Sequence, residues 1–580
     1  MKVSSNLGEK HFCQGTIKQV DVVNSERNML ELHIVVILDN IQARRNKDVL
    51  KELNRFLEGG MVVIHPVPAA VVEDRIRCFR CNFPSTMCEE NTPRGHIMST
   101  LLGRPSDNGV RMTVNDVNEE NDAWREEEGQ VHHVIQALNG RQRVTARMVM
   151  AGGLVHQQAP PGTGKTKVAA AIVKAWRDQN PESHISVMAC ANIPVVKLVQ
   201  ETADTCGEEQ LEAMQSLALF SAMAKDRHGE QIRDVERHTL INKIDAAAFI
   251  NKLGPEEKKA VNEYRQNCLE HPRFSQERKI GRIYKAFERP NITFSTAAMA
   301  TDFLEGEGTI VDTELLLFDE STQAQWAVVV HLVACLPRLQ AILLTGDRHQ
   351  LGVYLKELPE VFWRGFGLES VIEQIEISPG ANYTFLTKMY RSHPFLTQLI
   401  SYASYEIFNE SLIPSRSVEE RSLLTGSNFL LPIQSCPMGL INSFSSFRTD
   451  SKSDSLTDDH QTEVAEFLVR ALIQHFGPQF SRNVVVLCMY TFQTTETANR
   501  VKEFGVRTLT VDSYQAQECD VTIVVTTRSK FAERGSGKSD SMMFFKNNER
   551  ATVALSRARH GVFLIGDLVL RFGCNKKYFY

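Results

Sequence analysis

From about residue 136 onward, the chain alternates helical segments with short runs of almost wholly apolar residues. Each run has four or five members and is bounded by polar residues, which is typical of a strand buried on both faces. Such strands form parallel α/β sheets, in which ligands bind at the carboxyl ends of the strands. We therefore expect the chemistry of this protein in the polar and glycine clusters that follow the runs. The runs are at residues 315–318, 341–344, 484–487, 521–525 and 562–565.

Two stretches do not follow this alternation. Residues 1 to about 125 contain short apolar alternations at 30–36 and 61–64, which predict strands, and a helix is expected between them at 48–57. This pattern indicates a small β-rich accessory domain. Residues 204–289 have the pattern of helices without strands, which predicts a helical insertion in the first α/β domain.

The composition is that of an ordinary soluble globular protein, because 42% of the 580 residues are hydrophobic and 23% are charged. This length corresponds to about three or four domains. The 12 cysteines fit free thiols in a reducing compartment, and the N-terminus lacks the apolar core of a signal peptide. No run approaches ~18 consecutive apolar residues, so we expect no membrane span and a cytoplasmic or nuclear protein.

The strongest chemical signal is the glycine-rich segment APPGTGKT at residues 159–166. Glycines there allow consecutive backbone N–H groups to surround phosphate oxygens, where a Cβ atom would clash. Lys165 is expected to reach the β- and γ-phosphates of ATP, and the Thr166 hydroxyl to hold Mg²⁺. A helix expected at 168–176 would point its N-terminus at the phosphates. The predicted nucleotide-binding residues of this segment are Pro161, Gly162, Thr163, Gly164, Lys165 and Thr166.

Two adjacent acids, Asp319 and Glu320, directly follow the apolar run at 315–318. An acid at the end of a buried strand can hold Mg²⁺, and a second acid beside it can orient or deprotonate the attacking water. Acid pairs are common on protein surfaces, but these two cap an apolar strand downstream of a phosphate loop. The sequence therefore predicts a P-loop ATPase that uses ATP and Mg²⁺, with Lys165, Asp319 and Glu320 as catalytic residues and Asp319 as a metal ligand.

Five further motifs occur in an order and at a spacing that resemble the superfamily 1 helicases. The strings DESTQA and GDRHQLG are most similar to the up-frameshift helicases, the motor type of nonsense-mediated mRNA decay. The resemblance covers residues 136 to about 567 and implies two RecA-like α/β domains, at about 126–365 and 366–580. The motifs are LNGRQ at 138–142, TGDRHQL at 345–351, MYRSHP at 389–394, VDSYQAQE at 511–518 and VALSRAR at 553–559.

The resemblance implies a role for each matching residue. Gln142 and Tyr390 would hold the adenine, and Gln350 would sense the γ-phosphate. Arg391 and Arg557 belong to the second α/β domain and would reach across the cleft, so hydrolysis would depend on domain closure. The residues of these motifs that would line the ATP site are Gln350, Arg391, Glu518 and Arg557.

The candidate contacts to nucleic acid carry small hydroxyl and amide side chains, which bind phosphates without reading sequence. Ordinary loop capping explains the same residue types. Because the net charge is −5, any nucleic-acid site must be a local channel. The expected polymer is single-stranded RNA, or DNA. The candidates are Asn192, Ser295, Thr296, Thr510 and Ser513.

Some positions depart from the family pattern. The fifth motif has Ala516 and Gln517 where the family prefers glycine and arginine, and Ser392 replaces a methionine. The prediction is nucleic-acid-dependent ATP hydrolysis, with 5′-to-3′ movement as the family implies. One alternative is a clamp that grips a strand and displaces proteins without processive unwinding. The other is a non-enzymatic scaffold that has kept the helicase fold.

A cysteine cluster lies in the N-terminal region. Cys78, Cys81, Cys88 and His96 have the spacing C-x2-C-x6-C-x7-H. Four such ligands can bind zinc tetrahedrally, but the spacing fits no standard zinc finger. Structural zinc and free thiols both remain open.

Overall fold

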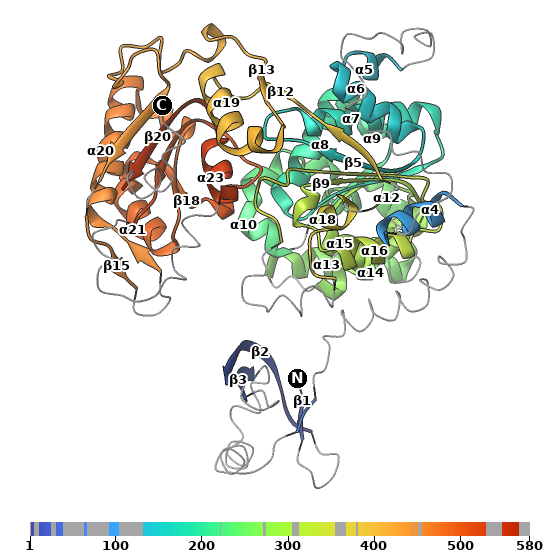
Figure 1. Ribbon diagram of the computed structural model, residues 1–580. Helices are drawn as coiled ribbons and strands as arrows, with labels where there is room; N and C mark the ends of the chain where they lie inside the picture. Colours follow the sequence, from blue (N-terminus) through green and yellow to red (C-terminus); the bar gives the residue numbers. More distant parts are fainter. Residues whose placement is uncertain are drawn as a thin grey trace. The chain divides into compact units, whose positions relative to one another are not determined.

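In the computed structural model the chain divides into two units, Met1–Cys81 and Asn82–Tyr580 (Figure 1). The structure describes residues 2–4, 11–24, 31–38, 63–65, 92–103, 132–220, 222–270, 274–303, 312–353, 367–376, 378, 381–443, 445–450, 455–528 and 548–567.

The described residues of the first unit form an antiparallel sheet in the order β3-β2-β1-β4. The alternation at 30–36 becomes β3, and that at 61–64 contributes to β4, so the expected β-rich character is confirmed for these residues. The helix expected at 48–57 lies outside the described residues. The strands are β1 (Lys2–Ser4), β2 (His11–Asn24), β3 (Glu31–Leu38) and β4 (Val63–His65).

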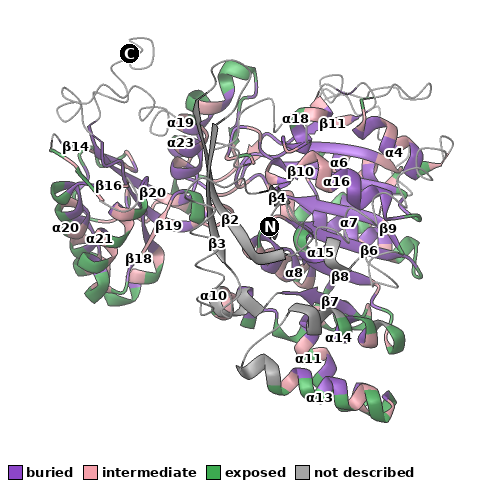
Figure 2. Cartoon of the chain, turned by 90° about the horizontal axis from the view of Figure 1, so that it is seen from below, coloured by how far each residue is buried: buried purple, intermediate pink, exposed green. Residues whose placement is uncertain are grey.

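The second unit contains a parallel sheet of seven strands in the order β11-β5-β10-β9-β6-β8-β7. The apolar runs at 315–318 and 341–344 lie in β9 and β10, where they are buried on both faces, as Figure 2 shows for this sheet. The strands are β5 (Gly153–Gln158), β6 (His184–Ala189), β7 (Ser216–Leu219), β8 (Ile292–Thr296), β9 (Thr313–Asp319), β10 (Ala341–Gly346) and β11 (Asn382–Phe385).

Amphipathic helices cover this sheet. In α7 the buried residues Val168, Ile172 and Trp176 recur at a spacing of four, which places them on one face of the helix. The capping box of α6 is formed by Asn139 and Gln142, which satisfy backbone N–H groups at its first turn. The principal helices are α5 (His133–Gln136), α6 (Gly140–Met150), α7 (Lys165–Gln179), α8 (Asn192–Cys206), α15 (Ala297–Phe303), α16 (Trp326–Ala334) and α18 (Val371–Glu376).

The segment predicted as a helical insertion lies between α8 and β8, but the expectation that it lacks strands is wrong. Residues 216–219 form β7, which pairs in parallel with β8. All four residues of this run are buried, including Ser216, and a run of four is too short for an amphipathic helix. The helices of the segment are α9 (Glu208–Ala213), α10 (Ala222–Arg233), α11 (Leu240–Asp245), α12 (Ala247–Lys252), α13 (Pro255–Glu270) and α14 (Phe274–Phe287).

A second parallel sheet follows, in the order β14-β20-β19-β17-β18. The runs at 484–487, 521–525 and 562–565 are its three central strands, so the predicted fold of two RecA-like α/β domains is confirmed. Its strands are β14 (Met438–Asn442), β17 (Val484–Cys488), β18 (Arg507–Thr510), β19 (Cys519–Val525) and β20 (Ala558–Gly566). Its principal helices are α19 (Pro394–Ile400), α20 (Asp459–Phe476), α21 (Thr491–Val501) and α23 (Asn548–Leu555).

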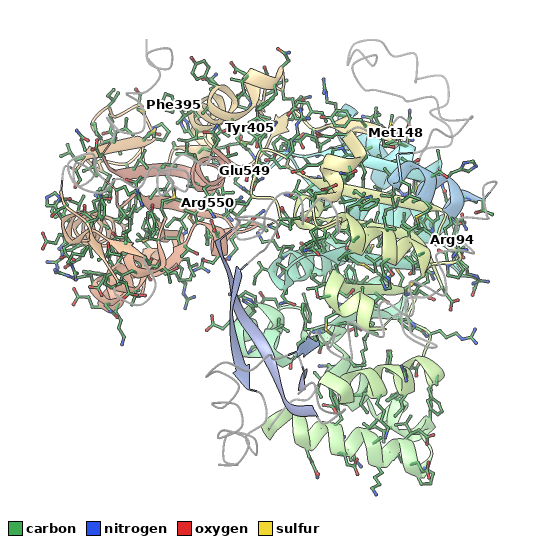
Figure 3. The ribbon with its side chains drawn as sticks, turned by 60° about the horizontal axis from the view of Figure 1, so that its bottom comes forward. Arg94, Met148, Phe395, Tyr405, Glu549 and Arg550 are labelled. Carbon is green, nitrogen blue, oxygen red and sulfur yellow. The ribbon has the colours of Figure 1, made fainter. Side chains whose placement is uncertain are left out.

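Two elements join the first RecA-like domain although the predicted boundaries placed them in its neighbours. Strand β11 follows residue 365, yet it pairs with β5 of the first sheet. Helix α4 (Pro93–Leu101) falls within the predicted accessory domain, yet it packs on the first RecA-like domain, where Trp326 Nε1 donates to Leu101 O at 2.8 Å and Arg94 Nη1 donates to Ala334 O at 3.3 Å (Figure 3 labels Arg94). Both corrections have one cause: strand pairing and helix docking depend on partners far away in sequence.

Candidate active site

Three of the predicted motifs meet at one edge of the first sheet. Parallel pairing aligns Gly346 with Gln158 and Asp319 with Ala189. Strands β5, β9 and β10 therefore end together, and the phosphate-loop segment, the acid pair and the third motif all follow from this edge. The expectation that the polar clusters share the carboxyl ends of these strands is confirmed.

The glycine-rich turn has the backbone of a phosphate cradle. Gly162 and Gly164 have φ angles of 73° and 86°, in the left-handed region that favours glycine. A Cβ atom on Gly162 would lie 2.5 Å from Arg391 Cβ, and one on Gly164 would lie 2.5 Å from Gln142 Nε2. The turn thus leaves no room for side chains at its two glycines and directly precedes the first residue of α7, which fits a phosphate group.

Gly162→Ala is expected to lower the free energy of unfolding by at least about 1 kcal/mol, because it combines a left-handed backbone with a clash against Arg391. Gly140→Ala is the matched control, since no atom lies within 4 Å of its added Cβ. Urea or thermal unfolding of both variants measures the difference. Equal stability of the two variants would contradict the tight packing of the turn.

Lys165 and the acid pair form a buried charge cluster. Lys165 Nζ lies 2.9 Å from Glu320 Oε1. Burial lowers the pKa of Lys165, but the charges of Glu320 and Asp319 outweigh it, so this pKa is raised. Burial by itself would raise the pKa of Glu320, but Lys165 outweighs it and the pKa is lowered. Burial raises the pKa of Asp319 to about 6. The Lys165 ammonium group thus lies beside two carboxyl groups whose pKa values are shifted in opposite directions.

The chain offers a setting for a magnesium ion beside this cluster. Thr166 lies one residue into α7, and Asp319 ends β9 at the same sheet edge. Glu320 Oε2 is buried and has no hydrogen-bond partner among the described residues, which leaves it free to accept from a water molecule. A carboxylate and a hydroxyl at this edge fit the oxygen ligands that Mg²⁺ prefers.

The third motif is organised around the buried carboxylate of Asp347. Gln158 Nε2 donates to its Oδ1 at 2.8 Å, and Gln350 Nε2 donates to its Oδ2 at 2.8 Å. Tyr405 OH, from the segment before β13 (Ile413–Pro414), donates to the same Oδ2 at 2.5 Å (Figure 3 labels Tyr405). Gln350 then accepts a hydrogen bond from Arg557 Nη2. The two RecA-like domains are therefore joined by a buried polar chain at the predicted γ-phosphate sensor.

The arginines of the second domain are held in defined positions. Arg391 Nε donates to Glu518 Oε2 at 2.5 Å, and Arg391 Nη1 donates to Ser556 O at 3.0 Å. Arg391 is the main cause that lowers the pKa of Glu518. Arg557 is 2% exposed, and burial, followed by the charge of Arg391, lowers its pKa to about 10. The Arg557 guanidinium thus remains cationic at neutral pH.

The two residues predicted to hold the adenine lie on either side of the phosphate loop. Gln142 Nε2 donates to Thr163 O at 2.9 Å. Tyr390 N donates to Gly162 O at 2.8 Å, and its hydroxyl accepts from Asn139 Nδ2 at 2.8 Å. Asn139, which also caps α6, therefore connects the two sides, and sequence analysis had not singled it out. The sequence feature that could have identified Asn139 is its place as a helix N-cap residue, three residues before Gln142.

The candidate contacts to nucleic acid divide into two groups. Asn192 begins α8, and Thr296 ends β8 beside the end of β6, so these two lie near the same edge. Thr510 Oγ1 and Ser513 Oγ are hydrogen-bonded to each other at 2.9 Å in the fifth motif. Ser295 is fully buried, so in this conformation its side chain is not presented to a strand.

The fifth and sixth motifs are tied to each other. Arg550, near the start of α23, donates two hydrogen bonds to Asp512, at 2.8 and 2.9 Å (Figure 3 labels Arg550). Glu518 directly precedes β19 and Arg557 directly precedes β20, and these strands are paired neighbours. Arg557, which contacts Gln350 of the first domain, therefore lies at the amino end of a strand of the second sheet.

Among the described residues, no group of three or more histidine, cysteine, aspartate or glutamate side chains is placed to hold a metal ion. Cys78, Cys81 and Cys88 lie outside the described residues, and His96 lies on α4. The zinc alternative thus stays a prediction.

Two family models match the chain, each described as an AAA domain, over residues 142–354 and 368–569. The chain is 25% identical to "Regulator of nonsense transcripts 1 homolog" of Arabidopsis thaliana over 446 residues, covering 74% of this chain and 32% of that protein. It is 23% identical to "ATP-dependent helicase NAM7" of Saccharomyces cerevisiae, covering 74% and 42%. By these matches the chain is similar to the up-frameshift-like branch of the superfamily 1 helicases.

The chain spans about a third of the length of the Arabidopsis relative and about two fifths of the length of the yeast relative. The structure of a PRRSV helicase is similar with a TM-score of 0.32 and 14% identity, covering 73% of this chain and 54% of that one. Among the described residues, no helix combines the length and apolar character that a membrane crossing requires.

Proposed function

We propose that this chain is an ATP-driven motor that hydrolyses ATP between its two RecA-like domains and moves along, or remodels, single-stranded nucleic acid. The observation that carries the proposal is the polar chain Asp347–Gln350–Arg557 across the cleft, next to the ion pair of Lys165 and Glu320. The name of the yeast relative, an ATP-dependent helicase, supports the same activity.

In the proposed mechanism, the backbone turn at Gly162 and Gly164 binds the phosphates and Lys165 neutralises their charge. Thr166 and Asp319 would hold Mg²⁺, which would supply positive charge to neutralise the developing charge on the phosphoryl oxygens. Glu320 accepts hydrogen bonds from the attacking water through its unpaired oxygen. This assignment requires the buried carboxylate to stay ionised, which the lowered pKa of Glu320 supports.

Arg391 and Arg557 complete the site from the second domain. A planar guanidinium matches the charge that spreads over a transferring phosphoryl group. In the present arrangement Arg557 contacts Gln350, so in the proposed cycle it exchanges this amide for a phosphate oxygen when ATP binds. Turnover would then depend on the relative position of the domains, which is how a motor couples chemistry to movement.

ATP turnover should be slow without polymer and stimulated by single strands of mixed sequence, with RNA at least as effective as DNA. The candidate contacts suit backbone rather than base edges, so sequence should have little effect. Each neutralised phosphate adds about −0.7 to the log–log salt slope for single strands, and we expect a shallow slope because the net charge is −5. Turnover against polymer concentration at two salt levels measures this.

A turnover rate that no RNA or DNA changes would contradict the motor proposal and leave an ATPase with another trigger. RNA that stimulates less than DNA would contradict only the proposed substrate. A soluble protein in the cytoplasm or nucleus is the setting that we propose for this activity.

A clamp without processive unwinding is the second candidate, favoured by the altered fifth motif. Ala516 has a φ of 61° where the family prefers glycine, and Gln517 replaces an arginine. A strand-displacement assay separates the two functions. Stimulated ATP turnover without displacement of a paired strand supports the clamp, whereas displacement supports the helicase.

A further inference from the structure

One lysine of the first RecA-like domain contacts the backbone of the fifth motif. Lys197 lies on α8, five residues after Asn192, and its Nζ donates to Ala516 O at 2.6 Å. Ala516 lies between the short helix η11 (Asp512–Tyr514) and β19, in the second domain. This hydrogen bond therefore joins a helix that begins at one candidate strand contact to the turn that carries another.

The ammonium group of Lys197 is surrounded by the charges of the candidate ATP site. Burial, followed by the charge of Arg391, lowers the pKa of Lys197 to about 8, although the charge of Glu518 acts to raise it. The charge of Lys197 in turn helps to keep the pKa of Glu518 low. Lys197 thus lies close enough to the Arg391–Glu518 pair to respond to a change in the charge beside it.

The carbonyl that Lys197 holds belongs to a residue with a strained backbone. Ala516 adopts a φ of 61°, in the left-handed region that is unfavourable for a residue with a Cβ atom. Directly after it, Gln517 N donates to Tyr514 O, which closes a turn that begins one residue after Ser513. The next residue, Glu518, binds Arg391. The orientation of this one peptide therefore affects both the strand-facing turn and the arginine pair.

We propose that Lys197 is a positioning residue that couples strand occupancy at the fifth-motif turn to the Arg391–Glu518 pair of the ATP site. The inference rests on the proposed function, because it needs a strand and a nucleotide that influence each other. A strand that shifts the turn would move Ala516 O relative to Lys197, and the ammonium group would transmit this displacement to Glu518. By linkage, a nucleotide at the phosphate site would change strand affinity by the same factor.

The test compares Lys197→Met, which keeps the apolar stem but removes the ammonium group, with Lys197→Arg, which keeps a cationic donor. Lys174→Met is the matched control, because Lys174 lies on α7 of the same domain and pairs with Asp178. For each variant, turnover is measured with and without single-stranded RNA. Fluorescence anisotropy gives the RNA affinity with and without a non-hydrolysable ATP analogue.

In Lys197→Met, the ratio of stimulated to basal turnover should fall at least about fivefold, the lower end of typical coupling between sites. The effect of the analogue on RNA affinity should shrink by the same factor. Lys197→Arg should restore most of both, and Lys174→Met should match the parent chain. A normal ratio in Lys197→Met, or equal losses of basal and stimulated turnover, would overturn the inference. A parent chain that RNA does not stimulate would instead overturn the proposed function.

Discussion

Glu320→Gln is expected to bind ATP and to lose turnover by about 10²–10⁴-fold, the range for removing a general base. Glutamine has the shape of glutamate but cannot take a proton from water. The parent carboxylate is suited to this task because it is 3% exposed, is kept ionised by Lys165 and has one oxygen without a partner among the described residues. A nucleotide titration beside a steady-state turnover assay measures both quantities.

Two comparisons make this prediction specific. Glu314→Gln is the matched control, because Glu314 accepts from Gln340 Nε2 at 3.0 Å at the end of β9 opposite to the acid pair. It should turn over at the parent rate. Lys165→Ala should instead lose ATP binding, since it removes the cation aimed at the terminal phosphates. A Glu320→Gln variant that turns over at the parent rate would show that Glu320 does not activate the water.

The central strands and the phosphate loop could be predicted because their signals are local. An apolar run such as 484–487 has no polar face, so it requires cover on both sides, and the structure provides it. The glycines at 162 and 164 likewise have a local reason, since their backbone angles favour glycine whatever surrounds them. Features of this kind can be recognised from a single sequence.

The elements that sequence analysis misplaced depend on partners far away in the chain. Strand β11 joins the first sheet only because β5 presents a free edge to it, more than 200 residues earlier. Helix α4 docks on the first domain through Trp326, although it lies in the N-terminal region. Strand β7 is a run of four residues inside a helical segment, where its pairing with β8 outweighs the surrounding helical pattern.

The candidate site shows the same division between local and distant causes. The motifs predict which residues face ATP, but they do not show which contacts hold these residues in place. Asp347 links three segments through Gln158, Gln350 and Tyr405, and only the folded chain brings these together. Lys197 belongs to none of the motifs, and its contact with Ala516 joins residues 319 positions apart in sequence.

Arg557→Ala should bind ATP nearly as well as the parent chain and lose roughly 10³–10⁵ in turnover, the range for arginine fingers. The reason is its position: it lies on the domain opposite Lys165 and contacts Gln350, the predicted γ-phosphate sensor, rather than the phosphate loop. Its lowered pKa of about 10 still leaves it cationic at neutral pH. An affinity titration and a turnover assay on the same preparation decide the prediction.

Because Arg557 is buried, its removal leaves Gln350 without this donor and can reduce stability, so a second variant is needed. Arg557→Lys keeps a cation but loses the planar fork that contacts two oxygens at once, and it should also lose most of the turnover. Arg500→Ala, at an exposed ion pair on α21, is the control for loss of an arginine from the same domain. If Arg557→Lys loses ATP affinity and turnover by the same factor, Arg557 is a ground-state ligand of ATP, because a residue that acts only on the transition state leaves binding intact.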